Sequence, residues 1–177
     1  MQQLQDAMTN LTGIDNSLTG RFSRFRSREK ITIITFNHEV QAITTFEIGD
    51  PSTQSADMAA VRDYVNNLQA GGETAIYTAL TEAYTLAADA FATDPDRYYS
   101  VVLMSDGRNT AGVHQAQFNQ FYQSLREGPQ QIRTFSILFG NAEEDDMQAI
   151  ATTTRGRMFD GRSTTLSTIF KEIRGYQ

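Results

Sequence analysis

The sequence predicts one α/β domain with an open, mostly parallel, doubly wound (Rossmann-like) sheet, one antiparallel edge strand and helices on both faces. Short apolar runs typical of buried strands alternate with segments of helical period, which is the pattern of a parallel sheet with crossover helices. Two strand-like runs lie only three residues apart, so they can only be antiparallel neighbours. The length of 177 residues suits one compact domain, and we expect residues 1–177 to form it.

A helix is predicted at the start of the chain by apolar side chains at spacings of three and four, namely Met1, Leu4, Met8 and Leu11. Gly13 supplies a stop signal, but no capping residue precedes this helix. Residues 14–29 are predicted to form a polar loop with turn signals. We therefore expect a helix that has an end but no ordinary beginning.

A hairpin follows. The β-branched run Lys30–Phe36 is typical of a buried strand, and Val40 to Ile48 has strand composition after the turn-like Asn37-His38-Glu39. Three later strands are expected at residues 99–104, 132–139 and 157–159. The first two are nearly continuous apolar runs, so we expect them in the interior of the sheet.

Five further helices are predicted by apolar positions at helical spacing, two of them before the strand at 99–104 and one after each later strand. The expected inward side chains are Met58, Val61, Val65 and Leu68; Ile76, Leu80, Ala83 and Leu86; Phe118, Phe121, Tyr122 and Leu125; Met147 and Ile150; and Leu166, Ile169, Phe170 and Ile173. The acids at 143–146 suit the first turn of a helix, where carboxylates favour the positive end of the dipole.

Charge and composition exclude several classes of function. The formal net charge is -6, from 21 acidic and 15 basic residues, which disfavours nucleic acid as the main partner. Arginines and phenylalanines alternate at residues 21–26, but a turn with its aromatic rings tucked inward explains this run better than a single-strand platform does. The chain has no cysteine, no membrane-length apolar run and no signal-peptide pattern at its start.

Two polar residues stand where ligands gather in such sheets, beyond the carboxyl ends of the strands. Asp106 follows a wholly apolar strand in a Ser-Asp-Gly turn, and Thr74 follows Gly71-Gly72-Glu73 at the start of a helix. Each has an ordinary alternative, because Asp before Gly is a common turn residue and Thr is a common helix cap.

Two segments together resemble a known family. Residues 71–80, with Thr74 after a Gly-rich turn, are similar to the second metal loop of von Willebrand factor A domains, which include the integrin I-like domains. Residues 101–107 are similar to the third metal loop, a hydrophobic strand that ends in Asp and Gly. The strands at 30–36 and 132–139 match the family's other core strands in order and spacing. The resemblance extends over essentially the whole chain.

The resemblance implies a metal-ion-dependent adhesion site, with no catalysis. Thr74 and Asp106 would be its metal-binding residues, Asp106 acting through a water, while Gly72 and Gly107 would shape the loops. Oxygen ligands suit Mg²⁺ or Mn²⁺, and the ion would take an Asp or Glu from a protein ligand. The implied function is therefore cation-dependent binding of a protein, for adhesion or assembly.

The first metal loop of the family, Asp-x-Ser-x-Ser, has no counterpart in this sequence. It follows the family's first strand, so we expect that strand and loop to lie upstream of Met1. One hydroxyl and one carboxylate are too few to hold a small cation tightly, and we expect weak metal binding or none in this chain. The strands on either side of the gap would then pair directly, or pair across a homodimer.

Two alternatives stay open. The chain could be a structural interaction module with no functional metal, which a partner binds at the same loops or at a sheet edge. Asp106 could instead accept a phosphoryl group, as in a response-regulator receiver, although no Lys follows the strand at 132–139. Hydrolase and nucleotide-binding functions are disfavoured because neither a Gly-x-Ser-x-Gly elbow nor a phosphate loop occurs.

Overall fold

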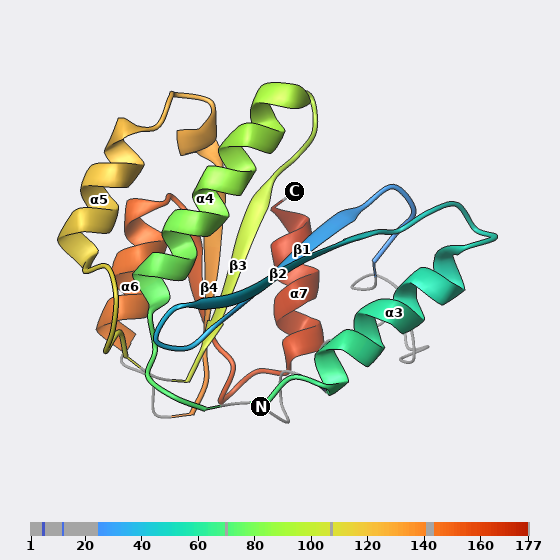
Figure 1. Cartoon of the computed structure of the whole chain (residues 1–177), viewed down its shortest axis with the longest axis horizontal. Coiled ribbons are helices and arrows are strands. Elements are labelled where there is room, and N and C mark those ends of the chain that lie inside the picture. The colour runs from blue at the N-terminus through green and yellow to red at the C-terminus, as the bar shows by residue number, and fades with distance from the viewer. Residues whose placement is uncertain are drawn as a thin grey trace. The chain divides into compact units, whose positions relative to one another are not determined.

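The structure is a computed structural model that describes residues 5, 12, 25–69, 71–106, 108–140 and 144–176. Figure 1 shows its helices and strands. The strands are β1 (Lys30–Phe36), β2 (Val40–Glu47), β3 (Ser100–Ser105), β4 (Arg133–Leu138) and β5 (Arg157–Asp160). The helices are α3 (Gln54–Asn66), α4 (Ile76–Thr93), α5 (Gln115–Ser124), the 3-10 turn η1 (Pro129–Gln131), α6 (Glu144–Thr153) and α7 (Leu166–Gly175).

The predicted α/β class is confirmed, and each strand lies within one or two residues of its expected position. Of the first predicted helix, Gln5 is described and is helical. The other residues of that helix, Gly13 and residues 14–24 of the predicted loop lie outside the described residues.

The described strands pair as two separate sheets rather than one. In the first, β1 pairs with β2; in the second, the order is β3-β4-β5. Backbone hydrogen bonds at both ends of the hairpin, from Ile48 to Glu29 and from Asn37 to Glu39, make the first sheet antiparallel. The expected direct pairing between the strand at 30–36 and the strand at 99–104 is therefore not observed among the described residues. Pairing across a homodimer stays a prediction.

The chain divides into two compact units. One comprises residues 34–42 and 72–163; the other comprises residues 1–33, 43–71 and 164–177. The first unit contains the hairpin tip, the parallel sheet and the helices from α4 to α6. The second contains the rest of the hairpin with α3 and α7.

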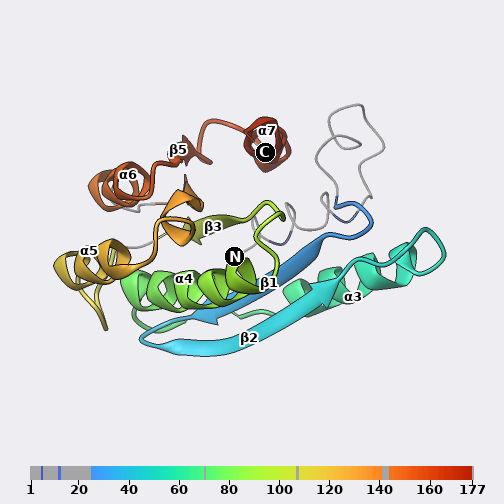
Figure 2. The same cartoon turned by 90° about the horizontal axis from the view of Figure 1, so that it is seen from above.

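In the unit with the parallel sheet, β3 pairs with β4 from Ser100 opposite Arg133 to Ser105 opposite Leu138, and β4 pairs with β5. Since β3, β4 and β5 lie side by side in chain order, right-handed crossovers place α5 and α6 on one face. Helix α4 packs there too, beside α5 (Figures 1 and 2). The core under these helices is formed by Ile76, Tyr77, Leu80, Tyr84, Leu103, Phe118, Tyr122, Ile132, Leu138, Met147 and Ile150.

A hydrogen-bonded polar network lies inside this core. The hydroxyl of Tyr84 donates to the carbonyl of Ile132 (2.7 Å) and pairs with the hydroxyl of Thr134 (2.8 Å). Thr134 and Thr154 are fully buried, and the backbone N–H of Thr134 donates to the Thr154 hydroxyl (3.3 Å). Every polar group of this network is thus paired, which is what burial requires. We call these residues the buried network.

The burial of α4 corrects one sequence-based expectation. Ile76 and Leu80 are buried as expected, but the other large buried side chains are Tyr77 and Tyr84, while Ala83 and Leu86 are only half-buried. A tyrosine can lie on the inner face because its ring fills the core and its hydroxyl finds a partner there.

The second unit has its own polar and aromatic contacts. Arg174 on α7 makes two hydrogen bonds to the carboxylate of Glu29, at 2.6 and 2.9 Å, and its guanidinium lies over the ring of Phe25. Phe46 on β2 packs edge-on against Tyr64 on α3. The four expected inward residues of α7 are all buried. Across the described part of the chain, no helix combines the length and apolarity that a membrane span needs.

Candidate functional site

The candidate site lies at the carboxyl ends of the parallel strands. Strand β3 ends at Ser105, whose carbonyl accepts a hydrogen bond from the N–H of Phe139 just after β4 (3.1 Å). Asp106 follows and is exposed. Gly140 has a positive φ of 51°, and a Cβ placed there would lie 3.2 Å from the Cβ of Asp106. The chain after β4 thus passes close beside Asp106, and glycine permits this approach.

Thr74 precedes α4 but does not cap it. The N-cap residue is Ala75, with no side-chain capping bond, and its N–H donates to the carbonyl of Asn37 (2.6 Å). The N–H of Tyr77 in the first turn of α4 instead donates to the side-chain oxygen of Asn109 (3.3 Å). The cap is therefore supplied by two neighbouring loops. The alternative role of Thr74 as a helix cap is wrong.

The backbone of Thr74 is held from both directions. Its N–H donates to the hydroxyl of Thr110 (2.9 Å), and its carbonyl accepts from the N–H groups of Thr110 (2.8 Å) and Ala111 (3.3 Å). These bonds join the loop before α4 to the loop after β3. The segments that resemble the second and third metal loops are thus brought together, as their placement at one sheet edge predicts.

Of the two glycines predicted to shape the loops, Gly72 is described by the structure. Gly72 has a φ of 87°, and a Cβ there would lie 3.3 Å from the Cβ of Asn37 in the hairpin turn. A side chain at this position would be strained by the backbone conformation and crowded by Asn37, which gives a reason for glycine in this loop. Gly107 lies outside the described residues.

A second polar network at this edge was not found from the sequence. The carboxylate of Asp146, in the first turn of α6, accepts from the hydroxyl of Tyr77 (3.3 Å) and from the N–H of Asn109 (3.4 Å). The side chain of Asn109 also donates to the carbonyl of Val113 (3.1 Å). We call Tyr77, Asn109 and Asp146 the edge network. The spacing of four residues between Asp146 and the buried Ile150 could have placed Asp146 on the inward face of α6, but it does not identify Asn109 as the partner.

Burial raises the pKa of the Tyr77 hydroxyl above its ordinary value, and the negative charge of Asp146 raises it further. The hydroxyl therefore stays protonated and remains a donor to Asp146 at neutral pH. Glu144 and Asp145, in the same first turn, are exposed. The acidic first turn of α6 is thus confirmed for its described residues, but Asp146 has a separate role in holding the loop after β3.

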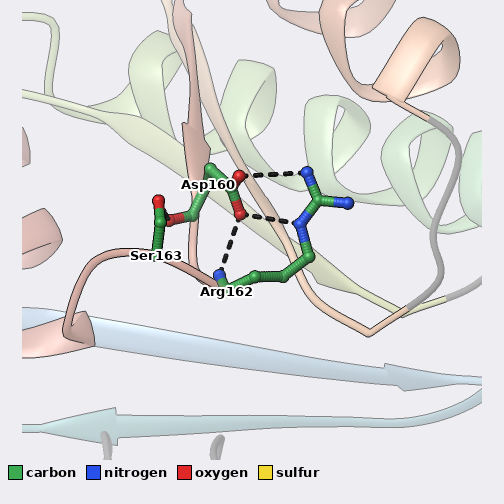
Figure 3. Close-up of polar contacts among 3 residues, drawn as sticks. All are labelled: Asp160, Arg162 and Ser163. Carbon is green, nitrogen blue, oxygen red and sulfur yellow. Dashed lines mark hydrogen bonds and ion pairs between the residues drawn. The ribbon is translucent and has the colours of Figure 1, made fainter.

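Strand β5 ends in a partly exposed acidic residue, Asp160, that is already paired. Figure 3 shows Arg162 bound to the carboxylate of Asp160 through its side chain (2.8 and 3.0 Å) and through its N–H (2.9 Å). The hydroxyl of Ser163 donates to the carbonyl of Asp160 (3.4 Å). The hydrogen bonds from Arg162 hold the pKa of Asp160 below its ordinary value. This carboxylate is therefore occupied by protein donors.

The donor set decides whether the described residues fit a divalent cation. Thr74 and Asp106 supply one hydroxyl and one carboxylate, whereas Asp146 and Asp160 already accept hydrogen bonds from the protein. No group of three acidic or histidine side chains is arranged for a metal among the residues that the structure describes. Mg²⁺ requires six oxygens in near-octahedral geometry. These residues alone do not fit a tightly held ion.

The comparison with known families agrees with the resemblance stated from the sequence. The family model described as von Willebrand factor type A domain matches residues 2–172. No match was found among curated proteins. Because the family match covers nearly the whole chain, this protein belongs to the von Willebrand factor type A domain family, whose members generally act as protein-interaction modules.

Proposed function

We propose that this domain binds a protein partner through the loop before α4 and the loop after β3, with Thr74 and Asp106 as contact residues. One observation carries the proposal. The Thr74 hydroxyl and the exposed Asp106 carboxylate make no hydrogen bond to another described residue, although the polar groups around them hold the loops in place. Groups that the fold positions but does not use are available to a ligand.

The proposed ligand offers an Asp or Glu carboxylate, and Mg²⁺ or Mn²⁺ is the proposed cofactor of the complete site. Two carboxylates repel each other, so a cation is the simplest way for Asp106 to share a site with an acidic ligand. That ion requires oxygen ligands beyond those of Thr74 and Asp106. The second candidate is metal-independent binding at the same loops, which the incomplete donor set favours.

No catalytic step forms part of the proposal. A receiver-like phosphoryl transfer to Asp106 would use a Lys near the end of the following strand, but that strand is followed by Phe139 and Gly140. The two lysines of the chain are Lys30, paired with Glu47 in the hairpin, and Lys171 on α7. Asp106 is therefore assigned a binding role.

The test begins with peptides selected against the full chain from a random displayed library in Mg²⁺, then measured against Asp106→Ala and Thr74→Val. We expect each variant to weaken binding at least about tenfold, because each removes a contact group without removing a bond of the fold. Asp94→Ala, at the far end of α4, is the matched control and should bind as the parent does. Equal binding by the parent and both site variants would place the contact surface elsewhere.

The role of the cation is read from the same peptides and from calorimetry. Binding abolished by a chelator, and Mn²⁺ heat that disappears in Asp106→Ala, would support a cation-dependent module. Peptide binding that survives the chelator, with no Mn²⁺ heat, would support the metal-independent candidate. Either result distinguishes the two candidates without a known partner.

A further inference from the structure

Asn109 bonds to three segments at the proposed binding edge. Its side-chain oxygen accepts from the N–H of Tyr77, its side-chain nitrogen donates to Val113 in its own loop, and its backbone N–H donates to Asp146. These bonds reach the start of α4, the end of the loop after β3 and the first turn of α6. The side chain and the backbone N–H of Asn109 therefore link these three segments to one another.

Asp146, in the first turn of α6, bonds to two of the same segments, the start of α4 and the loop after β3. One carboxylate oxygen accepts from the Tyr77 hydroxyl and the other from the N–H of Asn109. Asp146 is half-buried, whereas Glu144 and Asp145 in the same turn are exposed. All three carboxylates can stabilise the start of α6 through the helix dipole, so that effect does not require Asp146 to point inward. Its inward position is explained by the two donors that it binds.

The edge network also determines where Thr74 lies. Thr110, the residue after Asn109, makes the two hydrogen bonds that hold the backbone of Thr74, and Ala111 adds a third. Fixing Asn109 therefore fixes the residues that carry Thr74. Asp106 lies three residues before Asn109 in the same loop.

We propose that Asn109 and Asp146 are positioning residues, which hold the loop of Asp106 against the segment of Thr74 in the arrangement that binds the partner. The inference rests on the proposed function of these loops. Neither residue is assigned a contact with the ligand. In this arrangement a shift of the first turn of α6 changes the relative position of Thr74 and Asp106.

The test is amide hydrogen exchange on the full chain without any ligand. In Asp146→Ala, the amides of Asn109, Thr110 and Ala111 should exchange about tenfold faster, because the loop after β3 opens locally more often. The amide of Phe139, which binds the end of β3, should keep its rate. Asp146→Asn retains an acceptor oxygen and should restore most of the protection. Asp145→Ala, which removes an exposed carboxylate from the same turn, should leave all rates unchanged.

Three results would overturn the inference: unchanged exchange at Thr110 and Ala111 in Asp146→Ala, the same increase in Asp145→Ala, or a uniform increase at every amide. The last would mean that Asp146 contributes only to global stability. Asp106→Ala separates this inference from the proposed function, because Asp106 makes no hydrogen bond to a described residue and its loss should not change exchange. Peptide binding unaffected by Asp106→Ala would contradict the proposed function and leave the exchange result valid.

Discussion

The buried network and the edge network both begin with a tyrosine on α4, and they differ in what surrounds the hydroxyl. Tyr84 and Tyr77 lie seven residues apart, two helical turns, on the same inward face. The Tyr84 hydroxyl bonds to a buried threonine of β4 and to the carbonyl of the buried residue before that strand. The Tyr77 hydroxyl instead bonds to a half-buried carboxylate in the first turn of α6. The same residue type therefore supports the core in one place and holds a loop in the other.

The comparison teaches where a polar network can carry function. A buried network with every group paired has no capacity left for a ligand, and disrupting it destabilises the whole domain. At the edge of the sheet, water can replace a hydrogen bond that the network loses, so the loss costs less stability than it does in the buried network. Residues beside the edge network, such as Thr74 and Asp106, can therefore lie near solvent without destabilising the domain.

The largest expected effect comes from removing the ring between the two tyrosines. Phe118 is fully buried, with ring centroids 5.8 Å from Tyr77 and 6.0 Å from Tyr84. Phe118→Ala should lower the free energy of unfolding by about 3–5 kcal/mol, because the cavity removes packing from both networks. Urea unfolding measures the change. A loss below about 1 kcal/mol would mean that the two tyrosines do not depend on shared packing.

High pH should destabilise the domain through both tyrosines. Burial is the main cause that raises the pKa of Tyr84 and of Tyr77 above the ordinary value. An unfolded tyrosine loses its proton near pH 10, so above about that pH the unfolded chain binds fewer protons than the folded one and stability falls. Each unit by which a pKa is raised corresponds to about 1.4 kcal/mol. Urea midpoints measured from pH 8 to 12 should decline only above about pH 10, and a flat profile would contradict this.

Hydroxyl deletion separates the two networks. Tyr84→Phe leaves the Ile132 carbonyl and Thr134 hydroxyl without a buried partner and should cost about 1–3 kcal/mol of unfolding free energy. Tyr77→Phe should cost about 1 kcal/mol or less, because water can reach the half-buried carboxylate of Asp146. Parallel urea unfolding of the two variants checks the order. Equal losses would remove the distinction between the networks.

The smallest effect is expected at the end of β5. Asp160 and Arg162 are both partly exposed, so Asp160→Asn should leave the urea midpoint unchanged within error at neutral pH. The lowered pKa of Asp160 makes its contribution present above the unfolded pKa and lost as pH falls, but solvent screens it. Glu29→Gln is the comparison, because Arg174 and Glu29 are less exposed, and it should lower the midpoint measurably. The reverse order would mean that exposure does not decide the strength of these pairs.

Much of the fold could be predicted because its signals are local. The apolar run of β4 and the three-residue turn after Phe36 specify strands and a hairpin without reference to distant residues. The four inward residues of α7 could all be predicted for the same reason, because their helical spacing is a local pattern. Tyr77 and Tyr84 were not placed inside, since a tyrosine is buried only where its hydroxyl finds a partner, and those partners come from β4 and α6.

The two candidate site residues could be selected from the sequence, and their binding roles stay a prediction. Thr74 and Asp106 stand out in the sequence because a Gly-rich turn and an apolar strand precede them. The role of Thr74 as a helix cap was also a sound local expectation, and only the approach of Asn109 and Asn37 to the start of α4 removed it. Asn109 and Asp146 have no local pattern that reveals their pairing, because they lie 37 residues apart in the chain.

The sequence by itself therefore determined the family, the order of the elements and the positions of Thr74 and Asp106 in the loops beside β3 and α4. Periodicity, turn residues and a Gly-rich segment act over a few residues, so they can be read without coordinates. The tertiary structure alone decided which polar groups hold the loops and which make no hydrogen bond to another described residue. A hydrogen bond forms only between groups that the fold brings within about 3.5 Å, and that distance depends on the packing of α4, α6 and the sheet together.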